Sequence, residues 1–452
     1  MKIIIIILQA ILNLVCKRRD LIANRSKIPP EYRDDVVVWY SPKKQRLTNY
    51  DVIEAYTEDF KKWNNSPEKY TGSLTSNSLA LTNVSQKTAL IYSPIKPYDF
   101  KVLIRGLQEG QHVKFGFDYG EQILEADKDG VYTLEWKEGL ISYGIYTNFV
   151  GECNITITQL PTSILKDLSG NGNHAYMYGF QGKLNSGMGL YKVDFTSWRK
   201  SSVQTEVKPD VVKVTPNTSN YLFIQYANSV EIPSYKIKVI GLGDNVLKYQ
   251  YATENGRKEI NIVEGENELP TSIKVSNDYQ IGYRLTPGTS VFTITQIPDY
   301  PNQLCYSGKE YCISYNQPIL TDYTVIADRT WFAKDSVRTF SSKYKDTTVK
   351  PGLFRFEWTV NNSEYTSSLG KDTSVTFSDS ITWQTKTSYN GKALTNLSYE
   401  DGEHLIIGDY AKKIGNYYIG CHDDIIILKR SLTINEINDI TEAIFNETII
   451  EE

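Results

Sequence analysis

The stretch from Lys166 to Phe180, KDLSGNGNHAYMYGF, constrains the fold more than any other part of this chain. Its first half places glycine beside asparagine, a combination typical of a tight turn whose backbone needs positive φ. From His174 onward, small or apolar residues alternate with aromatic ones, the period of two that a strand shows when at least one face is covered. The stretch therefore predicts a turn that leads into a strand of a β-sandwich. Its structural residues are Asp167, Gly170, Asn171, Gly172 and Asn173.

Composition supports a protein built of several β domains. The chain has 452 residues, more than one hydrophobic core usually serves, so two to four domains are expected. Hydrophobic residues make up 40% and charged residues 23%, as in ordinary globular proteins. The 33 tyrosines favour strands, because aromatic side chains fit a pleated surface. A formal net charge of −4 provides no basic footprint, so we expect no nucleic-acid partner.

An internal repeat divides the chain. Gly151–Pro161 and Gly288–Pro298 share the pattern T-I-T-Q-[LI]-P at a fixed offset of 137 residues. Upstream, Tyr98–Val102 matches Tyr235–Val239 more loosely, and Val113–Tyr119 matches Val246–Tyr251. Each copy holds several alternating segments, enough for a small antiparallel sandwich.

The second copy interrupts the domain that the Lys166–Phe180 stretch begins, because strands that continue this domain return only after it. We therefore expect an inserted sandwich, which surface loops of a sandwich tolerate. The expected parts are an apolar and basic N-terminal segment (1–30), a strand plus helix that dock on a partner (31–90), repeat copy one (91–161), a discontinuous jelly roll (162–200 and 302–446) and the inserted repeat copy two (201–301).

Two helices are predicted. Apolar residues at helical spacing predict one from Tyr50 to Trp63. Near the C-terminus, Thr433 and Glu436 have the spacing of a capping box, and Leu432 with Ile437 that of a hydrophobic staple.

The D-L-S-G-N-G-N-H strand, the closing strand Tyr418–Leu428 and the L-T-x-x-E-I helix start together resemble structural proteins, of tail or fibre type, of phages that infect gut Bacteroidetes. These carry a concanavalin A-like, laminin-G-like domain. The resemblance covers Val36–Trp63 and most of Thr158–Phe445. It implies a mostly β chain: a laminin-G-like jelly roll interrupted by a small sandwich, with a short helical N-terminal region and a C-terminal helix. The chain departs from the family at Lys309-Glu310, where an acidic pair is expected.

Candidate ligand-binding residues are aromatic and oxygen-bearing. A sugar site needs an aromatic platform beside hydrogen-bonding groups. Trp331, Trp358, Trp383, Tyr389 and Asn390 are the candidates, with a packed core as the competing fate of each tryptophan. Calcium is the metal that loop carboxylates favour. Its candidate ligands are Asp409, Asp423 and Asp424, with a solvated pair as the alternative for the last two. We find no paired carboxylates at glycosidase spacing and no nucleophile elbow, and therefore expect no enzymatic activity.

The N-terminus and the cysteines leave alternatives open. Met1–Val15 is apolar and Lys17-Arg18-Arg19 follows it, so the segment is a signal peptide, an anchor or a peptide that docks on a partner. Cys305 and Cys312 bracket a short hairpin, which leaves a disulfide between them open.

The expected function is that of a phage virion structural protein, a head fibre, tail fibre or tail-accessory component, assembled in the host cytoplasm. It would contact other virion proteins through its N-terminal region and a host surface glycan through its jelly roll. A homo-oligomer is expected, with a trimer inferred by analogy with fibres. The alternative is a Bacteroidetes glycan-binding protein exported to the cell surface or periplasm, and a third possibility is a hydrolase.

Overall fold

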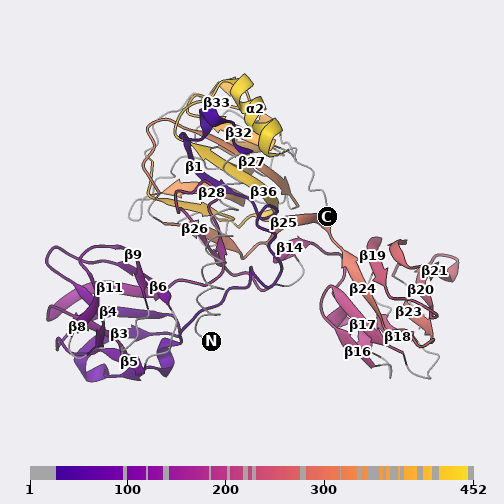
Figure 1. Ribbon diagram of the computed structural model, residues 1–452, viewed down its shortest axis with the longest axis horizontal. Helices are drawn as coiled ribbons and strands as arrows, with labels where there is room; N and C mark the ends of the chain where they lie inside the picture. Colours follow the sequence, from indigo (N-terminus) through magenta and orange to yellow (C-terminus); the bar gives the residue numbers. More distant parts are fainter. Residues whose placement is uncertain are drawn as a thin grey trace, which may run out of the picture.

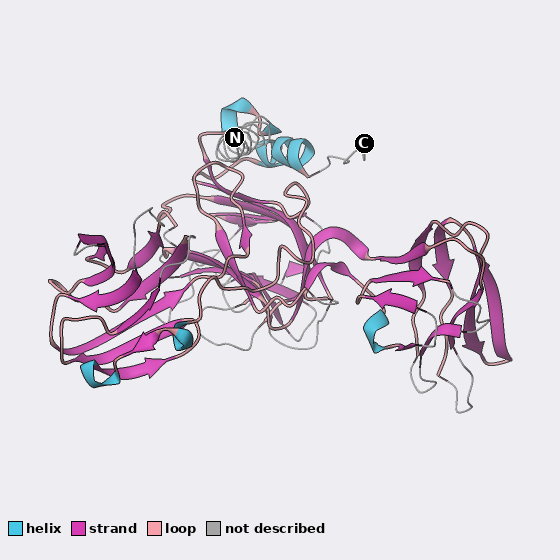
Figure 2. Ribbon diagram, turned by 60° about the horizontal axis from the view of Figure 1, so that its bottom comes forward, coloured by secondary structure: helices cyan, strands magenta, loops and turns pink. Residues whose placement is uncertain are grey.

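The computed structural model describes residues 27–94, 99–118, 121–135, 142–182, 185–200, 204–216, 222–226, 231–274, 281–315, 317–332, 338–344, 356–359, 363–366, 375–376, 381–393, 401–409 and 417–445. Strands dominate this part of the chain. They form a central jelly roll flanked by two small sandwiches, and helix α2 (Ile434–Ile444) lies on the jelly roll (Figure 1). Figure 2 shows the same three bodies after a turn about the horizontal axis. The prediction of a mostly β, multi-domain protein of sandwiches with a C-terminal helix is confirmed.

Two eight-stranded sheets make the jelly roll. The first runs β14 (Gly187–Leu190), β25 (Asp299–Ser307), β36 (Ile419–Leu428), β27 (Thr324–Trp331), β32 (Ile381–Thr385), β33 (Ser388–Tyr389) and β34 (Lys392–Ala393), with β1 (Val36–Tyr40) beside β36. The second runs β12 (Ile164–Leu165), β13 (Ala175–Tyr178), β26 (Tyr311–Ser314), β35 (His404–Ile407), β28 (Arg338–Tyr344), β29 (Phe356–Thr359), β30 (Ser363–Thr366) and β31 (Val375–Thr376). Met177, Tyr306 and Ile425 are among the buried residues that fill the core between them.

Sandwich one lies before the jelly roll strands β12 and β13 in sequence. Its two five-stranded sheets are β2 (Asn64–Asn65), β5 (Ile91–Pro94), β10 (Ser142–Thr147), β7 (Val113–Asp118) and β8 (Glu121–Ala126), and β3 (Tyr70–Leu74), β4 (Ser78–Val84), β11 (Gly151–Gln159), β6 (Phe100–Arg105) and β9 (Gly130–Leu134).

In sequence, sandwich two is inserted between β14 and β25. These two strands pair with each other in the first jelly-roll sheet. Its sheets are β15 (Arg199–Lys200), β18 (Leu222–Tyr226), β23 (Ile281–Thr286), β20 (Val246–Thr253) and β21 (Gly256–Ile262), and β16 (Gln204–Val207), β17 (Val211–Thr215), β24 (Phe292–Ile297), β19 (Tyr235–Ile240) and β22 (Gly265–Leu269). The strand order is the same, strand for strand, in both sandwiches, so the repeat seen in the sequence is a repeat of the fold.

Equivalent turns show how the two copies align. After β6, the carboxylate of Asp129 accepts the backbone N–H of Gly106 at 2.9 Å. After β19, Glu264 accepts the N–H of Gly241 at 2.9 Å in the same way. Both glycines have positive φ. When the copies are aligned by these turns, Phe100 is the residue equivalent to Tyr235. The looser sequence match had placed Tyr98 there, two residues earlier.

The N-terminal part differs from its prediction. β1 is a strand of the jelly roll, and β2 to β4 belong to sandwich one, although all four lie within residues 31–90, the range expected to dock on a partner. Residues 50–63, predicted as a helix, form turns and the single 3-10 turn η2 (Phe60–Lys62). The apolar residues of this segment are buried in two different cores, with Val52 in the jelly roll and Phe60 and Trp63 in sandwich one. A helix would have had to place them on one face.

The segment that enters each sandwich has the pattern D-F-x-x-W. In sandwich one, Asp59 accepts the N–H of Lys61 and begins η2. In sandwich two, Asp194 accepts the N–H of Thr196 and begins η4 (Phe195–Ser197), which ends at Trp198. Trp198 is therefore a core residue of sandwich two, packed against Tyr283. Two further short 3-10 turns are η1 (Pro30–Tyr32) and η3 (Pro67–Lys69).

Helix α2 covers the outer face of the first jelly-roll sheet. Its capping box forms as predicted: Thr433 Oγ1 accepts the N–H of Glu436, whose carboxylate accepts the N–H of Thr433 at 2.7 Å. Ile437, Ile440 and Ile444 are buried against the sheet. In the part of the chain that the structure describes, no helix has the length and apolar character needed to cross a membrane. Residues 1–26, for which a signal peptide, an anchor or a docking peptide was expected, lie outside it.

Cys305 and Cys312 are both free. Cys305 lies on β25 of the first jelly-roll sheet, whereas Cys312 lies on β26 of the second. The hairpin between them thus crosses from one sheet to the other, and the residue opposite Cys305 in the sheet is Cys421 of β36, which is also a free cysteine.

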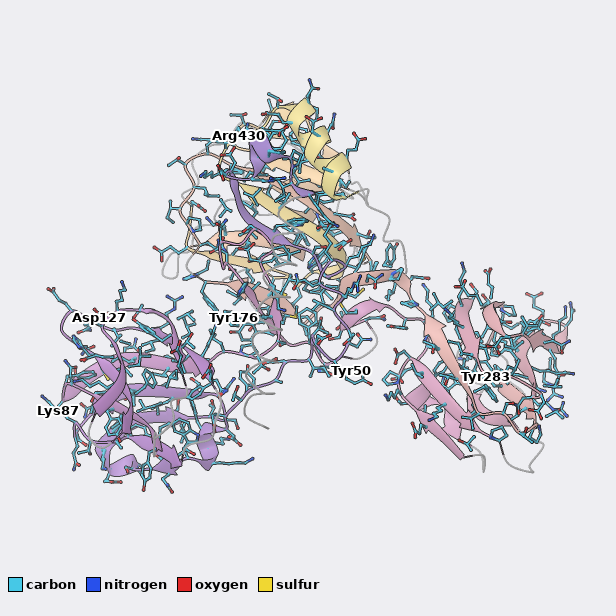
Figure 3. The ribbon with its side chains drawn as sticks, viewed as in Figure 1. Tyr50, Lys87, Asp127, Tyr176, Tyr283 and Arg430 are labelled. Atoms are coloured by element: carbon cyan, nitrogen blue, oxygen red, sulfur yellow. The ribbon has the colours of Figure 1, made fainter. Side chains whose placement is uncertain are left out.

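Both sandwiches contact the jelly roll through side chains (Figure 3). On sandwich one, Arg105 Nη2 lies 2.7 Å from His404 Nε2. Lys101 Nζ lies 5.8 Å from the ring centroid of Tyr176. On sandwich two, Lys208 Nζ lies 5.6 Å from the ring centroid of Tyr50.

Candidate functional site

The residues expected to bind sugar do not gather on one surface. Trp331 is buried in the jelly-roll core, with its ring centroid 4.7 Å from that of Tyr418. Trp383 lies on the opposite face of the same sheet and packs against the apolar cluster under α2. The Oδ1 atom of Asn390 accepts the N–H of Trp383 at 2.8 Å, so this side chain holds the hairpin turn. The side chains of Trp358 and Tyr389 lie outside the described part of the structure.

The aspartates expected to bind calcium are occupied by protein groups. Asp424 accepts from Trp39 Nε1 at 2.6 Å and pairs with Lys44 Nζ at 3.2 Å. Asp423 Oδ1 lies 3.3 Å from the hydroxyl of Ser41. Burial, together with the charge of Asp424, raises the pKa of Asp423 to about 7. Asp409 is buried after β35. Among the described residues, no three His, Cys, Asp or Glu side chains converge as a metal would require.

The loop Asp167–Asn173 holds strand β1 in place through hydrogen bonds. Asp167 Oδ1 accepts the N–H of Trp39 at 3.0 Å, and its Oδ2 accepts the N–H of Asn173 at 3.0 Å. The side-chain amides of Asn171 and Asn173 donate to the carbonyl of Val37 at 3.1 and 2.9 Å. Gly170 and Gly172 have the positive φ that the sequence predicts. The loop's polar groups are thus used inside the fold, which makes it a structural element rather than a ligand site.

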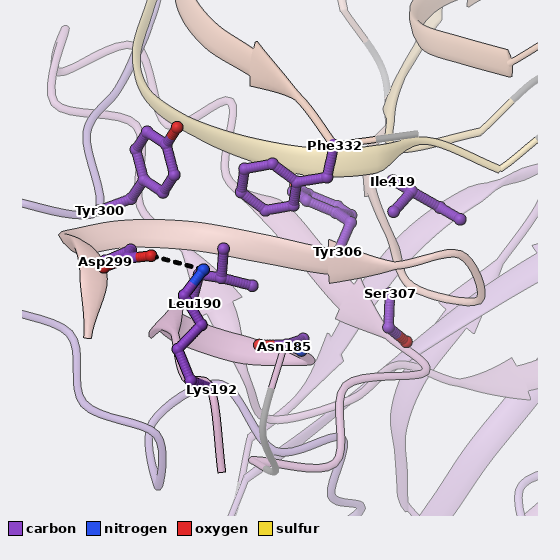
Figure 4. Close-up of a pocket in the computed structure, with 9 residues that line it drawn as sticks. All are labelled: Asn185, Leu190, Lys192, Asp299, Tyr300, Tyr306, Ser307, Phe332 and Ile419. Atoms are coloured by element: carbon purple, nitrogen blue, oxygen red, sulfur yellow. Dashed lines mark ion pairs between the residues drawn. The ribbon is translucent and has the colours of Figure 1, made fainter. Parts of the chain in front are cut away.

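A pocket of about 450 Å³ opens where sandwich two joins the jelly roll. We call this place the neck, meaning two segments, β14 with the residues that flank it and β25. Figure 4 shows that the side chains come from both neck segments, from the residue after β27 and from the start of β36. The lining residues are Asn185, Leu190, Lys192, Asp299, Tyr300, Tyr306, Ser307, Phe332 and Ile419.

Two aromatic rings form one wall of the pocket. The ring centroids of Tyr300 and Phe332 lie 5.3 Å apart at an interplanar angle of 40°. Tyr300 is 38% exposed, so part of its ring is available to a ligand. Behind them, Tyr306 is fully buried, and its hydroxyl lies 2.9 Å from His422 Nε2. Burial raises the pKa of Tyr306 well above its ordinary value. The Tyr306 hydroxyl at the back of the pocket is therefore uncharged at neutral pH.

Polar side chains lie beside the rings. Lys192 Nζ and Asp299 Oδ2 form an ion pair at 2.8 Å. Asn185 Oδ1 accepts the backbone N–H of Tyr191 at 3.1 Å. The Nδ2 group of Asn185 is the hydrogen-bond donor of the same side chain. The Ser307 hydroxyl donates to Glu310 Oε1 at 2.7 Å, so its oxygen can still accept. Donors, acceptors and aromatic faces therefore converge within one cavity.

The backbone around the pocket is strained. Among the described non-glycine residues, Asn185, Tyr300 and Asn302 are three of the five with positive φ, at 66°, 52° and 65°. Asparagine tolerates this region, but for tyrosine it costs roughly 1–2 kcal/mol. Such strain concentrates at functional sites, where the surrounding structure maintains it.

Sequence reasoning missed this pocket because its residues come from segments far apart in the chain. The irregular run Pro298–Asn302, P-D-Y-P-N, was the available signal. It begins at the last residue of the repeat motif, where the insert returns to the jelly roll, and segments that connect parts of a fold often carry function.

Comparisons with known proteins assign no family. No family model matches the chain, and no curated protein does. Among solved structures, it is similar to Trypanosoma rangeli sialidase in complex with sialic acid, at 8% identity and a TM-score of 0.24, over 83% of this chain and 84% of that one. It is also similar to the M60 catalytic domain with the CBM51-1 and CBM51-2 domains from Clostridium perfringens ZmpB, at 10% identity and a TM-score of 0.16, over 83% of this chain and 39% of that one. Bacillus subtilis oxalate decarboxylase matches at 9% identity and a TM-score of 0.14, over 55% and 78%.

One expectation is corrected by these comparisons. The chain was expected to have no enzymatic activity, but the similar structures include sialidases and an oxalate decarboxylase, which are enzymes. That expectation is therefore withdrawn. Likeness of this size assigns no activity to the chain itself. The physical reason is that paired carboxylates and a nucleophile elbow cover only some of the catalytic arrangements that β folds can carry.

Proposed function

We propose that this chain is a carbohydrate-binding protein and that the pocket at the neck is its binding site. The observation that carries the proposal is the pair of rings of Tyr300 and Phe332, 5.3 Å apart, beside four polar side chains in one cavity. Sugars present apolar C–H faces together with hydroxyls, so they need aromatic area and hydrogen-bonding groups at the same place. The strained backbone at Tyr300 supports the same site.

The biological setting is also a proposal. It rests on the resemblance of D-L-S-G-N-G-N-H and the closing strand and helix to phage structural proteins. On this view the chain is a virion component that contacts other virion proteins through its N-terminal region and forms a homo-oligomer, and its sugar is a glycan on the host surface. The alternative is an exported cell-surface protein of the bacterium. Intact mass of the native protein distinguishes them, because an exported chain loses Met1–Val15 whereas a virion component retains it.

A glycan array, followed by titration calorimetry with the best ligand, tests the binding site. We expect Phe332→Ala and Tyr300→Ala each to weaken binding about 10-fold or more, since loss of one aromatic contact is worth about 1.4 kcal/mol. The matched control is Tyr92→Ala on sandwich one, because Tyr92 is 41% exposed and Tyr300 38%. Glycan binding that all three variants retain would place the site elsewhere, and absence of any glycan ligand would refute the proposal.

A further inference from the structure

The two charged residues of the pocket neutralise each other. Lys192 follows β14 and Asp299 begins β25, so the two neck segments bring them side by side. Their side chains are 35% and 51% exposed, and Nζ lies 2.8 Å from Oδ2. Both side chains line the pocket, where they meet as a positive and a negative charge (Figure 4).

This pair disfavours an anionic ligand. A sugar carboxylate placed near Lys192 Nζ would also lie near the Asp299 carboxylate, whose repulsion offsets much of the attraction. The desolvation of the ligand's own charge is a further unfavourable contribution. A further carboxylate, Glu310, lies behind Ser307 and accepts its hydroxyl at 2.7 Å, so it adds negative potential on that side.

An uncharged sugar avoids this cost. One hydroxyl can donate to Asp299 while its neighbour accepts from Lys192, and the ion pair stays intact. The Asn185 amide and the Ser307 oxygen are further partners, and the rings of Tyr300 and Phe332 offer apolar faces. Hydrogen bonds to charged groups are the stronger kind, about 1.5–3 kcal/mol each.

On the basis of the proposed carbohydrate binding, we infer that the pocket selects uncharged sugars whose neighbouring hydroxyls bridge Lys192 and Asp299, and that it rejects uronic acids and other carboxylate-bearing sugars. The ion pair is then the specificity determinant of the site, and Asp299 is the residue that excludes anions.

Titration calorimetry on the full chain tests this inference. The ligands are pairs of oligosaccharides that differ only at C6, so that one member carries a hexose where the other carries a hexuronic acid. We expect the neutral member to bind at least about 10-fold more tightly. Asp299→Asn leaves Lys192 without its counter-charge, so we expect this ratio to fall by about 10-fold or to invert. Glu259→Gln is the matched control, because it removes the acid of the ion pair with Lys248 at 3.4 Å on sandwich two, away from the pocket. Equal thermal melting of the variants confirms that they are folded.

The outcomes separate the two proposals. If the wild-type chain binds the uronic member as tightly as the neutral one, and Phe332→Ala abolishes both, carbohydrate binding at the neck stands and the selectivity inference is overturned. The same holds if Asp299→Asn leaves the ratio unchanged. If neither sugar binds in a way that depends on Phe332 or Tyr300, the proposed function fails, and the inference fails with it.

Discussion

Gln159 and Gln296 occupy equivalent places in the two small sandwiches and make the same contact. Gln159 Oε1 accepts the N–H of Glu58 at 3.1 Å, and Gln296 Oε1 accepts the N–H of Val193 at 3.1 Å. Glu58 and Val193 each stand directly before a D-F-x-x-W turn. The glutamine of the T-I-T-Q motif therefore ties the strand that leaves each sandwich to the segment that enters it.

Replacing Gln296 with leucine should loosen sandwich two. The side chain also donates to the carbonyl of Val193 at 2.8 Å, so the variant leaves buried backbone groups without a partner. Each such group costs about 1–3 kcal/mol. We expect faster amide hydrogen exchange in β24 and a lower melting temperature. Gln108→Leu, at an exposed glutamine of sandwich one, is the control. Unchanged exchange in β24 would show that the contact does not stabilise the sandwich.

Asp167→Ala should release strand β1. Its carboxylate accepts three backbone N–H groups, those of Trp39, Ser169 and Asn173, at 3.0, 2.9 and 3.0 Å. Loss of these partners should destabilise the jelly roll by about 2 kcal/mol or more. Proteolysis near residues 36–40 reports the release, with the exposed Asp127→Ala as control. A protease-resistant variant would mean that the pairing of β1 with β36 suffices.

Asp423 should make stability depend on pH. Burial raises its pKa in the folded chain to about 7, against an ordinary value of 3.8. Between these values the folded state holds a proton that the unfolded state has released, so the free energy of unfolding falls as pH rises from about 4 to 7. Asp423→Asn should therefore be more stable than wild type at pH 8, by roughly 1–3 kcal/mol, and similar below pH 4. Denaturant unfolding at both pH values measures this. A variant that is less stable at pH 8 contradicts it.

Acid should separate sandwich one from the jelly roll. Burial and the nearby Arg105 guanidinium lower the pKa of His404 to about 4. Because the folded pKa lies below the ordinary 6.5, the stabilisation is present above pH 6.5 and is lost as pH falls through 4. The protonated ring would then face the Arg105 guanidinium, whose Nη2 lies 2.7 Å from His404 Nε2. Small-angle scattering should show a larger radius of gyration at pH 4 than at pH 7.

His404→Gln tests the cause of that expansion, because glutamine keeps an acceptor but does not titrate. The variant should keep the same radius at both pH values. His112→Gln, at a histidine of sandwich one that pairs with Glu125, should expand as wild type does. Expansion in the His404 variant would place the acid-sensitive contact elsewhere.

Local patterns in the sequence were enough to predict much of the fold. The positive φ of Gly170 and Gly172, the capping box of Thr433 and Glu436 and the two copies of T-I-T-Q depend on neighbours in the chain, so they can be read from it directly. The helix predicted at Tyr50–Trp63 was wrong because its apolar spacing reflects burial in two separate cores, which no local pattern distinguishes from one helical face.

Local sequence patterns could not predict the candidate site. Tyr300, Phe332 and Asn185 come together because β14 and β25 pair across the insert, β36 lies beside β25, and β27, which Phe332 follows, lies beside β36. Trp331 and Trp383, which the sequence suggested as sugar contacts, lie on opposite faces of one sheet. Which strand edges meet, and which face of a strand is covered, depends on contacts between residues more than a hundred positions apart. The chain's alternation shows that a strand has two faces, and the packing of the sheets sets which face a ligand can reach.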